Sequence, residues 1–163
     1  MLFQFENFAI DVDVEQTRKY YKETQRTLTE GCDCVLCKNF LAAYKGLGPE
    51  IRDFFEHLGV DISKAPDMTT MHGDPERNIL YYDGFYHLCG SVVDGAIRQE
   101  ISQAPGSSFF CTPRYSVTSA CEVYFTTRHA LVEKGFPDPV LEMEVSVEVP
   151  WVLGGKFTDA LGW

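Results

Sequence analysis

Three cysteines stand close together in the run C-D-C-V-L-C, as Cys32, Cys34 and Cys37. Thiolates bind Zn²⁺ tetrahedrally through bonds of about 2.3 Å, so the ligands must converge from a tight turn. A helical pattern of apolar residues begins at Cys37, and a helix N-terminus stabilises thiolates through its free N–H groups and its dipole. The residue types and spacing therefore predict a zinc site at the start of a helix.

A fourth ligand is available in the later run F-Y-H-L-C-G, which contains His87 and Cys89. Residues two apart on a strand point to the same face, so either side chain, or both, could reach one metal ion. Three thiolates with one imidazole, or four thiolates, form an ordinary structural zinc shell. We expect this fourth ligand to staple the helical region to the sheet.

The same cysteines have other interpretations. Reduced cysteine behaves as a small apolar residue and is often buried, an interpretation that fits Cys111 and Cys121. The C-V-L-C segment also has the C-x-x-C spacing of disulfide exchange, although that chemistry usually occurs beside a βαβ unit, which this sequence lacks. Thiolate shells accept iron as well as zinc, so the spacing leaves the metal open.

Other catalytic motifs are absent from the sequence. It contains no G-x-S-x-G elbow, no G-x-G-x-x-G fingerprint and no P-loop. Glu142 and Glu144 share one face of a predicted strand, and paired carboxylates act as general acid and base only inside a cleft. We expect both to point outward into solvent, and we predict no catalytic residue and no organic cofactor.

The apolar spacing in the first part of the chain predicts one strand followed by helices. Alternation indicates a strand over residues 8–14, and a short helix is expected over 15–24. Helical spacing then runs over 37–44 and, after Pro49, over 51–58. A short glycine-containing loop separates the last two helices, which we expect to form a helical hairpin.

The rest of the chain has the signals of short strands. Asp83-Gly84 is a typical hairpin dipeptide between 79–82 and 85–93, and Asp94-Gly95 precedes a candidate return strand over 96–101. Residues 103–108 are expected to be a loop. Further strands are predicted around Tyr115–Thr118, Cys121–Thr126 and, most clearly, over 141–149.

This order of elements predicts an α+β fold with an N-terminal strand, a helical hairpin and an antiparallel β-meander of five or six strands. No repeat or linker divides the chain, so we expect a single domain over 1–163, with residues 153–163 as a loose C-terminal tail.

Composition and charge limit the possible partners. The 163 residues include 14 Lys or Arg and 24 Asp or Glu, giving a formal net charge of −10. Direct binding to nucleic-acid phosphates is therefore not expected, and a protein partner would more naturally be basic. No apolar run approaches the ~18 residues of a membrane span, and no basic segment opens a secretion signal. We expect a cytoplasmic protein without membrane contact.

Three short runs carry a resemblance. E-G-C-D-C-V-L-C-K-N-F, G-F-Y-H-L-C-G and V-P-W-V-L resemble segments of a group of small uncharacterised bacterial proteins, over most of the chain. The group has no established activity, so the resemblance implies no substrate and no catalytic residue. It does imply that the cysteine run and the His-x-Cys strand belong together.

The leading hypothesis is a zinc-stapled binding or adaptor module whose protein partner is unknown, rather than an enzyme. A thiol- or metal-dependent hydrolase using the same cysteines and His87 is one alternative. A metal-free interaction protein with an acidic surface rich in tyrosine is the other.

Overall fold

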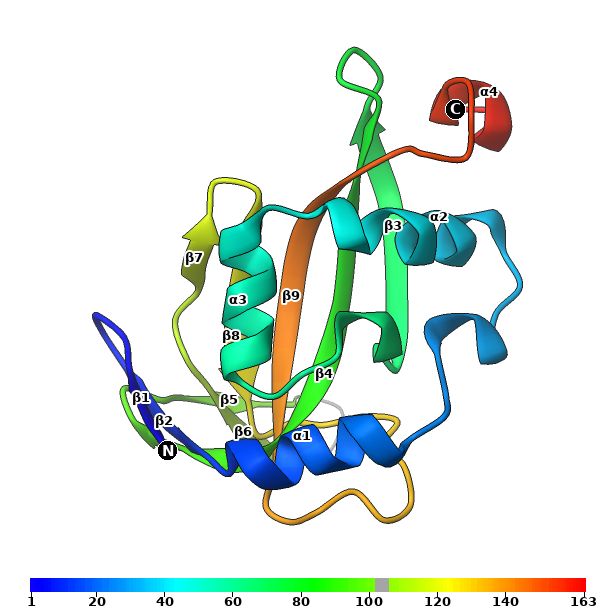
Figure 1. Cartoon of the computed structure of the whole chain (residues 1–163). Helices are drawn as coiled ribbons and strands as arrows, with labels where there is room; N and C mark the ends of the chain where they lie inside the picture. The colour runs from blue at the N-terminus through cyan, green and yellow to red at the C-terminus, as the bar shows by residue number, and fades with distance from the viewer. Residues whose placement is uncertain (102–105) are drawn as a thin grey trace.

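The fold is built on a curled antiparallel sheet (Figure 1). The computed structural model describes residues 1–101 and 106–163. Within these residues the sheet has the order β1-β2-β4-β9-β8-β6-β5, with β3 paired to β4 and β7 paired to β8. The predicted combination of helices with an antiparallel sheet is confirmed, but the nine described strands exceed the five or six expected.

The elements have the following bounds. The strands are β1 (Leu2–Gln4), β2 (Ala9–Val12), β3 (Asp67–Asp74), β4 (Ile79–Asp94), β5 (Ile97–Glu100), β6 (Ser108–Cys111), β7 (Tyr115–Thr118), β8 (Cys121–Thr126) and β9 (Val140–Pro150). The helices are α1 (Val14–Glu23), α2 (Val35–Ala43), α3 (Pro49–His57) and α4 (Phe157–Leu161). Short 3₁₀ turns lie at Leu28–Glu30, Tyr44–Gly46 and Ile62–Lys64.

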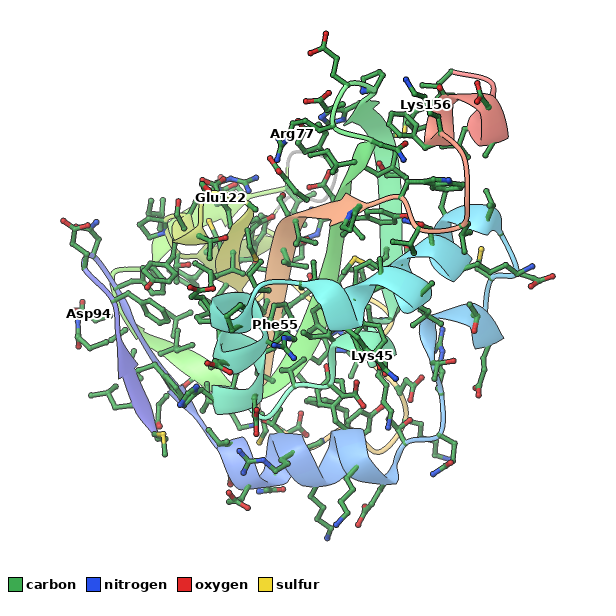
Figure 2. The ribbon with its side chains drawn as sticks, turned by 45° about the horizontal axis from the view of Figure 1, so that its top comes forward. Lys45, Phe55, Arg77, Asp94, Glu122 and Lys156 are labelled. Carbon is green, nitrogen blue, oxygen red and sulfur yellow. The ribbon has the colours of Figure 1, made fainter. Side chains whose placement is uncertain are left out.

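The predicted helices over the middle of the chain are confirmed, but they do not form a hairpin. In Figure 1, α2 and α3 run at a large angle to each other over the same face of the sheet. Phe40 of α2 packs on Tyr82 with ring centroids 5.4 Å apart, and Phe55 of α3 packs on Tyr86 at 5.1 Å. Figure 2 shows Phe55 among the side chains between α3 and the sheet. Each helix is thus positioned by the sheet.

The hairpin predicted at Asp83-Gly84 is wrong, because β4 continues through both residues. The true connection from β3 to β4 spans residues 75–78, where Asn78 adopts a positive φ of 53°. Gly84 lies opposite Met68, and a Cβ there would collide with the Met68 side chain and the Asp67 carbonyl. This glycine therefore permits close approach of β3 rather than a turn.

The predicted return strand over 96–101 exists as β5, but it pairs with β6 instead of β4. The end of β4 is already paired with β2, where Val92 stands opposite Ile10. That edge of β4 therefore has no free backbone groups for β5 to pair with. The loop expected over 103–108 falls partly on residues 102–105, outside the described residues, and β6 already begins at Ser108.

The strand predicted over 141–149 is confirmed as β9, but the expectation that its glutamates are exposed is wrong. β9 is an interior strand between β4 and β8, and near Glu142 the segment that follows β8, including Ala130, lies over its face. Glu142 is only 3% exposed, and its carboxylate accepts a hydrogen bond of 2.9 Å from the Ala130 backbone N–H. Glu144 is half-buried.

The C-terminal segment is docked rather than loose. Residues 157–161 form the short helix α4, and Phe157 is 1% exposed within the main apolar core. The Phe157 N–H donates to the Asn78 side chain at 3.1 Å. The prediction of a loose tail over 153–163 is therefore wrong. None of the described helices is long and apolar enough to cross a membrane.

Candidate metal centre

The cysteine run forms the entry to α2. Cys34 is the N-cap of this helix and has extended backbone angles of φ −74° and ψ 158°. Its Sγ accepts a hydrogen bond of 3.4 Å from the backbone N–H of Cys37. An N-cap side chain ordinarily satisfies one of the free N–H groups of the first turn, and here a sulfur takes that role. Helix capping therefore fixes Cys34 and Cys37 on the same side of the turn.

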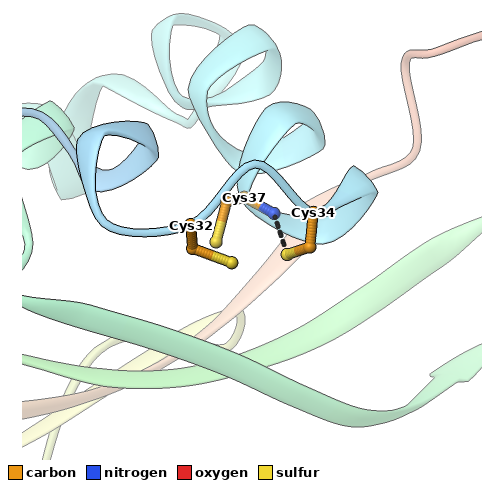
Figure 3. Close-up of side chains that lie close together, drawn as sticks. All are labelled: Cys32, Cys34 and Cys37. Carbon is orange, nitrogen blue, oxygen red and sulfur yellow. Dashed lines mark hydrogen bonds between the residues drawn. The ribbon is translucent and has the colours of Figure 1, made fainter.

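Cys32 is the third member of the cysteine cluster. The Sγ atoms of Cys32, Cys34 and Cys37 all lie within 4.8 Å of one another, and Figure 3 shows the three side chains turned toward a common space beneath the loop. Zn–S bonds of about 2.3 Å place tetrahedral sulfur ligands about 3.8 Å apart. The observed spacing reaches that arrangement through small side-chain adjustments. Cys37 is buried, whereas Cys32 and Cys34 are exposed.

The thiols differ in acidity. Partial burial opposes ionisation of Cys34, but hydrogen bonds from the Cys37 backbone N–H and the Cys32 thiol lower the pKa of Cys34 below its ordinary value. Burial, together with hydrogen bonding to Cys34 and Cys32, raises the pKa of the Cys37 thiol. Without a metal, Cys34 is therefore a stronger acid than Cys37. A bound cation would allow all three to ionise.

Two buried polar side chains join α2 to the sheet below the cysteines. The Tyr82 hydroxyl donates to the Leu36 carbonyl at 2.9 Å. The Asn39 amide donates to the Pro150 carbonyl at 3.1 Å and accepts from the Val152 N–H at 2.8 Å. The start of α2 is therefore tied to β4 and to the end of β9, which holds the cysteine loop in place.

The structure does not bring His87 and Cys89 to the cysteine cluster. The His87 Nε2 lies 3.4 Å from the Glu142 carboxylate, and its ring packs against Phe136 with centroids 5.6 Å apart. The Cys89 thiol donates to the Asp138 carbonyl at 3.4 Å. Neither donor atom belongs to the group of converging ligands among the described residues. The structure therefore does not place the predicted fourth ligand from this strand at the cysteine cluster.

Strand alternation is the physical reason for that separation. Tyr82 and Tyr86 contact α2 and α3, so the even-numbered residues of this part of β4 face the helices. His87 and Cys89 have the opposite parity and point to the other side of the sheet. They share one face, as expected, but it is not the face that supports α2.

The remaining cysteines lie apart from the cluster. Cys121 is 1% exposed within the apolar core, and burial raises the pKa of its thiol to about 12. Cys111 is also buried, and its sulfur lies 3.2 Å from the Gln99 side-chain amide nitrogen. Both agree with the interpretation that these two residues are buried reduced thiols.

Comparison of the chain with protein-family models, with curated proteins and with solved structures gave no match. Three thiols converge at a helix N-terminus, two of them accessible from solvent. Such a group can hold a thiophilic metal ion, and it can also form a disulfide.

Proposed function

We propose that the chain is a zinc-binding interaction module whose metal is held by the thiolates of Cys32, Cys34 and Cys37. The observation that carries the proposal is the convergence of their three Sγ atoms within 4.8 Å of one another. Thiolate ligands are those that soft and borderline cations such as Zn²⁺ prefer. Three thiolates also donate enough charge to weaken the Lewis acidity of the ion, which favours a structural role over hydrolysis.

The fourth coordination position is the basis for the interaction. No fourth His, Cys, Asp or Glu donor converges with the cluster within the described part of the chain, and Cys32 and Cys34 are exposed. A water molecule or a side chain of another protein can therefore complete the shell. The formal net charge of −10 favours a basic partner surface around that ligand.

Titration with Co²⁺ tests this proposal, because Co²⁺ occupies zinc sites and thiolate ligation gives it an intense charge-transfer absorption. We expect saturation at one Co²⁺ per chain, displacement by Zn²⁺, and loss of the absorption in Cys34→Ser. Cys89→Ser is the matched control and should retain both stoichiometry and spectrum. A wild-type titration without thiolate charge transfer would overturn the proposal.

A second function, thiol–disulfide exchange, is favoured by the exposure pattern of the same residues. Cys34 is exposed at the N-cap, and Cys37 is buried one turn into the helix. The Cys34 thiolate would attack one sulfur of a partner disulfide and release a thiolate. The Cys37 thiol would then lose its proton and attack the Cys34 sulfur, releasing the second thiol. The partner disulfide is reduced to two thiols as the cysteine pair is oxidised.

Equilibration of the metal-free protein with glutathione disulfide separates the two functions. Exchange predicts an intramolecular disulfide between Cys34 and Cys37, seen as the loss of two hydrogen atoms by mass spectrometry and as a crosslinked peptide. If Zn²⁺ protects all three cysteines from this reaction at one ion per chain, metal binding is the primary function. Rapid oxidation in the presence of Zn²⁺ would favour exchange.

A further inference from the structure

A second polar site lies away from the cysteines, on the face of β9 opposite Met143 and Val145. It is a cavity of about 390 Å³, which we call the Glu144 cavity. Its walls come from β5, β6, β8 and β9 and from the segments that follow β6 and β8. Its polar lining includes Gln99, Thr112, Arg114, Tyr124, Arg128 and Glu144.

Two guanidinium groups in this cavity have no carboxylate partner among the described residues. Arg114 lies over the Tyr124 ring at 5.1 Å from its centroid, and Arg128 lies over the Phe109 ring at 5.7 Å. No carboxylate of the described residues comes within 4.0 Å of either guanidinium. The aromatic rings orient the two cations and leave their N–H groups free to donate. In a chain of net charge −10, this is a local site of positive charge.

A carboxyl group stands beside the two arginines. Glu144 is cross-strand partner of Tyr124. Burial, the charge of the neighbouring Glu142 carboxylate and a hydrogen bond to Glu142 raise the pKa of Glu144 to about 7, although Arg128 and Arg114 act in the opposite direction. Near neutral pH a large fraction of Glu144 is therefore uncharged.

We propose that the Glu144 cavity binds the oxyanion group of a small molecule, either a carboxylate or a phosphate, between Arg114, Arg128 and Glu144. Guanidinium groups match the geometry of both anions. The protonated Glu144 carboxyl carries no charge that would repel the ligand, and the side chains of Gln99 and Thr112 are further polar groups in the lining. This site is separate from the cysteine cluster and does not depend on its metal.

Binding should depend on the protonation of Glu144. The groups that face this carboxyl are Glu142 on β9, Tyr124 on β8, Cys111 on β6, and Arg114 and Arg128 on the connecting segments. Tyr124 stays neutral, since burial raises the pKa of its hydroxyl. Ionised Glu144 repels an anion, whereas protonated Glu144 does not. The affinity should therefore increase as the pH falls through about 7.

The test uses benzoate as a carboxylate and sulfate as a stand-in for phosphate, because both stay fully ionised near neutral pH. Each is titrated into the full chain, and the backbone amide NMR shifts of Thr112 and Thr126 are followed. We expect saturable binding of at least one anion, weakened about tenfold or more in Arg114→Gln and in Arg128→Gln, because each loses charge-assisted hydrogen bonds. Both arginines are exposed, so these variants should fold. Arg52→Gln, on the exposed side of α3, is the matched control and should bind as the wild type does.

The pH arm compares the affinity at about pH 6 and about pH 8. Wild type should bind the anion about tenfold more tightly at the lower pH, and Glu144→Gln should show no such difference. Saturation by benzoate alone identifies a carboxylate site, and saturation by sulfate alone identifies a phosphate site. Absence of saturation by either anion up to about 50 mM would overturn the proposal. Binding that is unchanged in both arginine variants would also overturn it.

Discussion

The Tyr82 hydroxyl, from the central strand β4, donates to the Leu36 carbonyl in the first turn of α2 at a distance of 2.9 Å. Tyr82 has no exposed surface. Leu36 lies between Cys34 and Cys37, so this single bond links the interior of the sheet to the backbone that carries the thiols. The cysteine cluster is thus held by the core, although it lies at the surface.

Replacing Tyr82 by phenylalanine should therefore weaken both the fold and the metal site. The Leu36 carbonyl loses its buried donor, and we expect the free energy of unfolding to fall by about 1–2 kcal/mol. Urea unfolding with and without Zn²⁺ measures the change. Tyr44→Phe is the matched control, since its hydroxyl bonds to none of the described residues. An equal effect of the two substitutions would contradict the assigned role of Tyr82.

Asn39 is the second connection between α2 and the sheet, and Asn39→Ala should cost more than Tyr82→Phe. The substitution leaves both the Pro150 carbonyl and the Val152 N–H without their side-chain partner. We expect a loss of about 3 kcal/mol in urea unfolding, because two hydrogen bonds of the fully buried Asn39 side chain are lost and its place in the core is left partly empty. Asn7→Ala, at an exposed position, should change stability little. A loss below about 1 kcal/mol for Asn39→Ala would show that these bonds are replaced by water.

Glu144 should make stability depend on pH in a defined direction. Its pKa is raised from 4.5 to about 7 in the folded state, so between those values the folded chain binds more protons than the unfolded chain. The contribution of Glu144 to stability is then present below about pH 4.5 and is lost as the pH rises through about 7. Glu144→Gln removes this dependence. The stability of the variant relative to wild type should increase from about pH 4 to about pH 8 in urea unfolding, and a constant difference would contradict the shift.

The C-terminal segment should contribute substantially to stability. Phe157 is 1% exposed and packs beside Trp163 with ring centroids 5.9 Å apart. We expect Phe157→Ala to lower the free energy of unfolding by about 3 kcal/mol, as for other buried aromatic side chains. Leu153→Ala, at a position 42% exposed, is the control in the same segment. If both substitutions have the same small effect, the segment is not docked in solution.

Local sequence patterns predicted a helix or strand correctly where the contacts that determine it lie close together along the chain. The apolar spacing of Ile51 and Phe55 defined α3, and the alternation of Leu141, Met143 and Val145 defined β9. The spacing of Cys32, Cys34 and Cys37 likewise predicted a convergence that depends only on a local helix cap. In each case the determining contacts lie within a few residues along the chain.

Predictions failed where distant segments decide the outcome. Asp83-Gly84 has the sequence of a turn, but Met68 on β3 needs the space that Gly84 provides. Glu142 reads as a solvent-facing residue because its sequence does not show that the segment containing Ala130 lies over that face of β9. The Glu144 cavity is hidden in the same way, because Arg114 and Arg128 come from other parts of the chain. The sequence does not show which face of β4 meets α2, so it does not reveal that His87 and Cys89 lie away from the cysteine cluster.

The most direct test of the central claim is the zinc content of the full chain purified without added metal, with reactive thiols counted before and after chelation. If the three cysteines bind zinc, we expect one Zn²⁺ per chain and three thiols that become reactive when the metal is removed. Cys34→Ser should lose the ion, and Cys89→Ser should keep it. A chain that contains no zinc and binds none on titration, with Cys32, Cys34 and Cys37 equally reactive before and after chelation, would contradict the account.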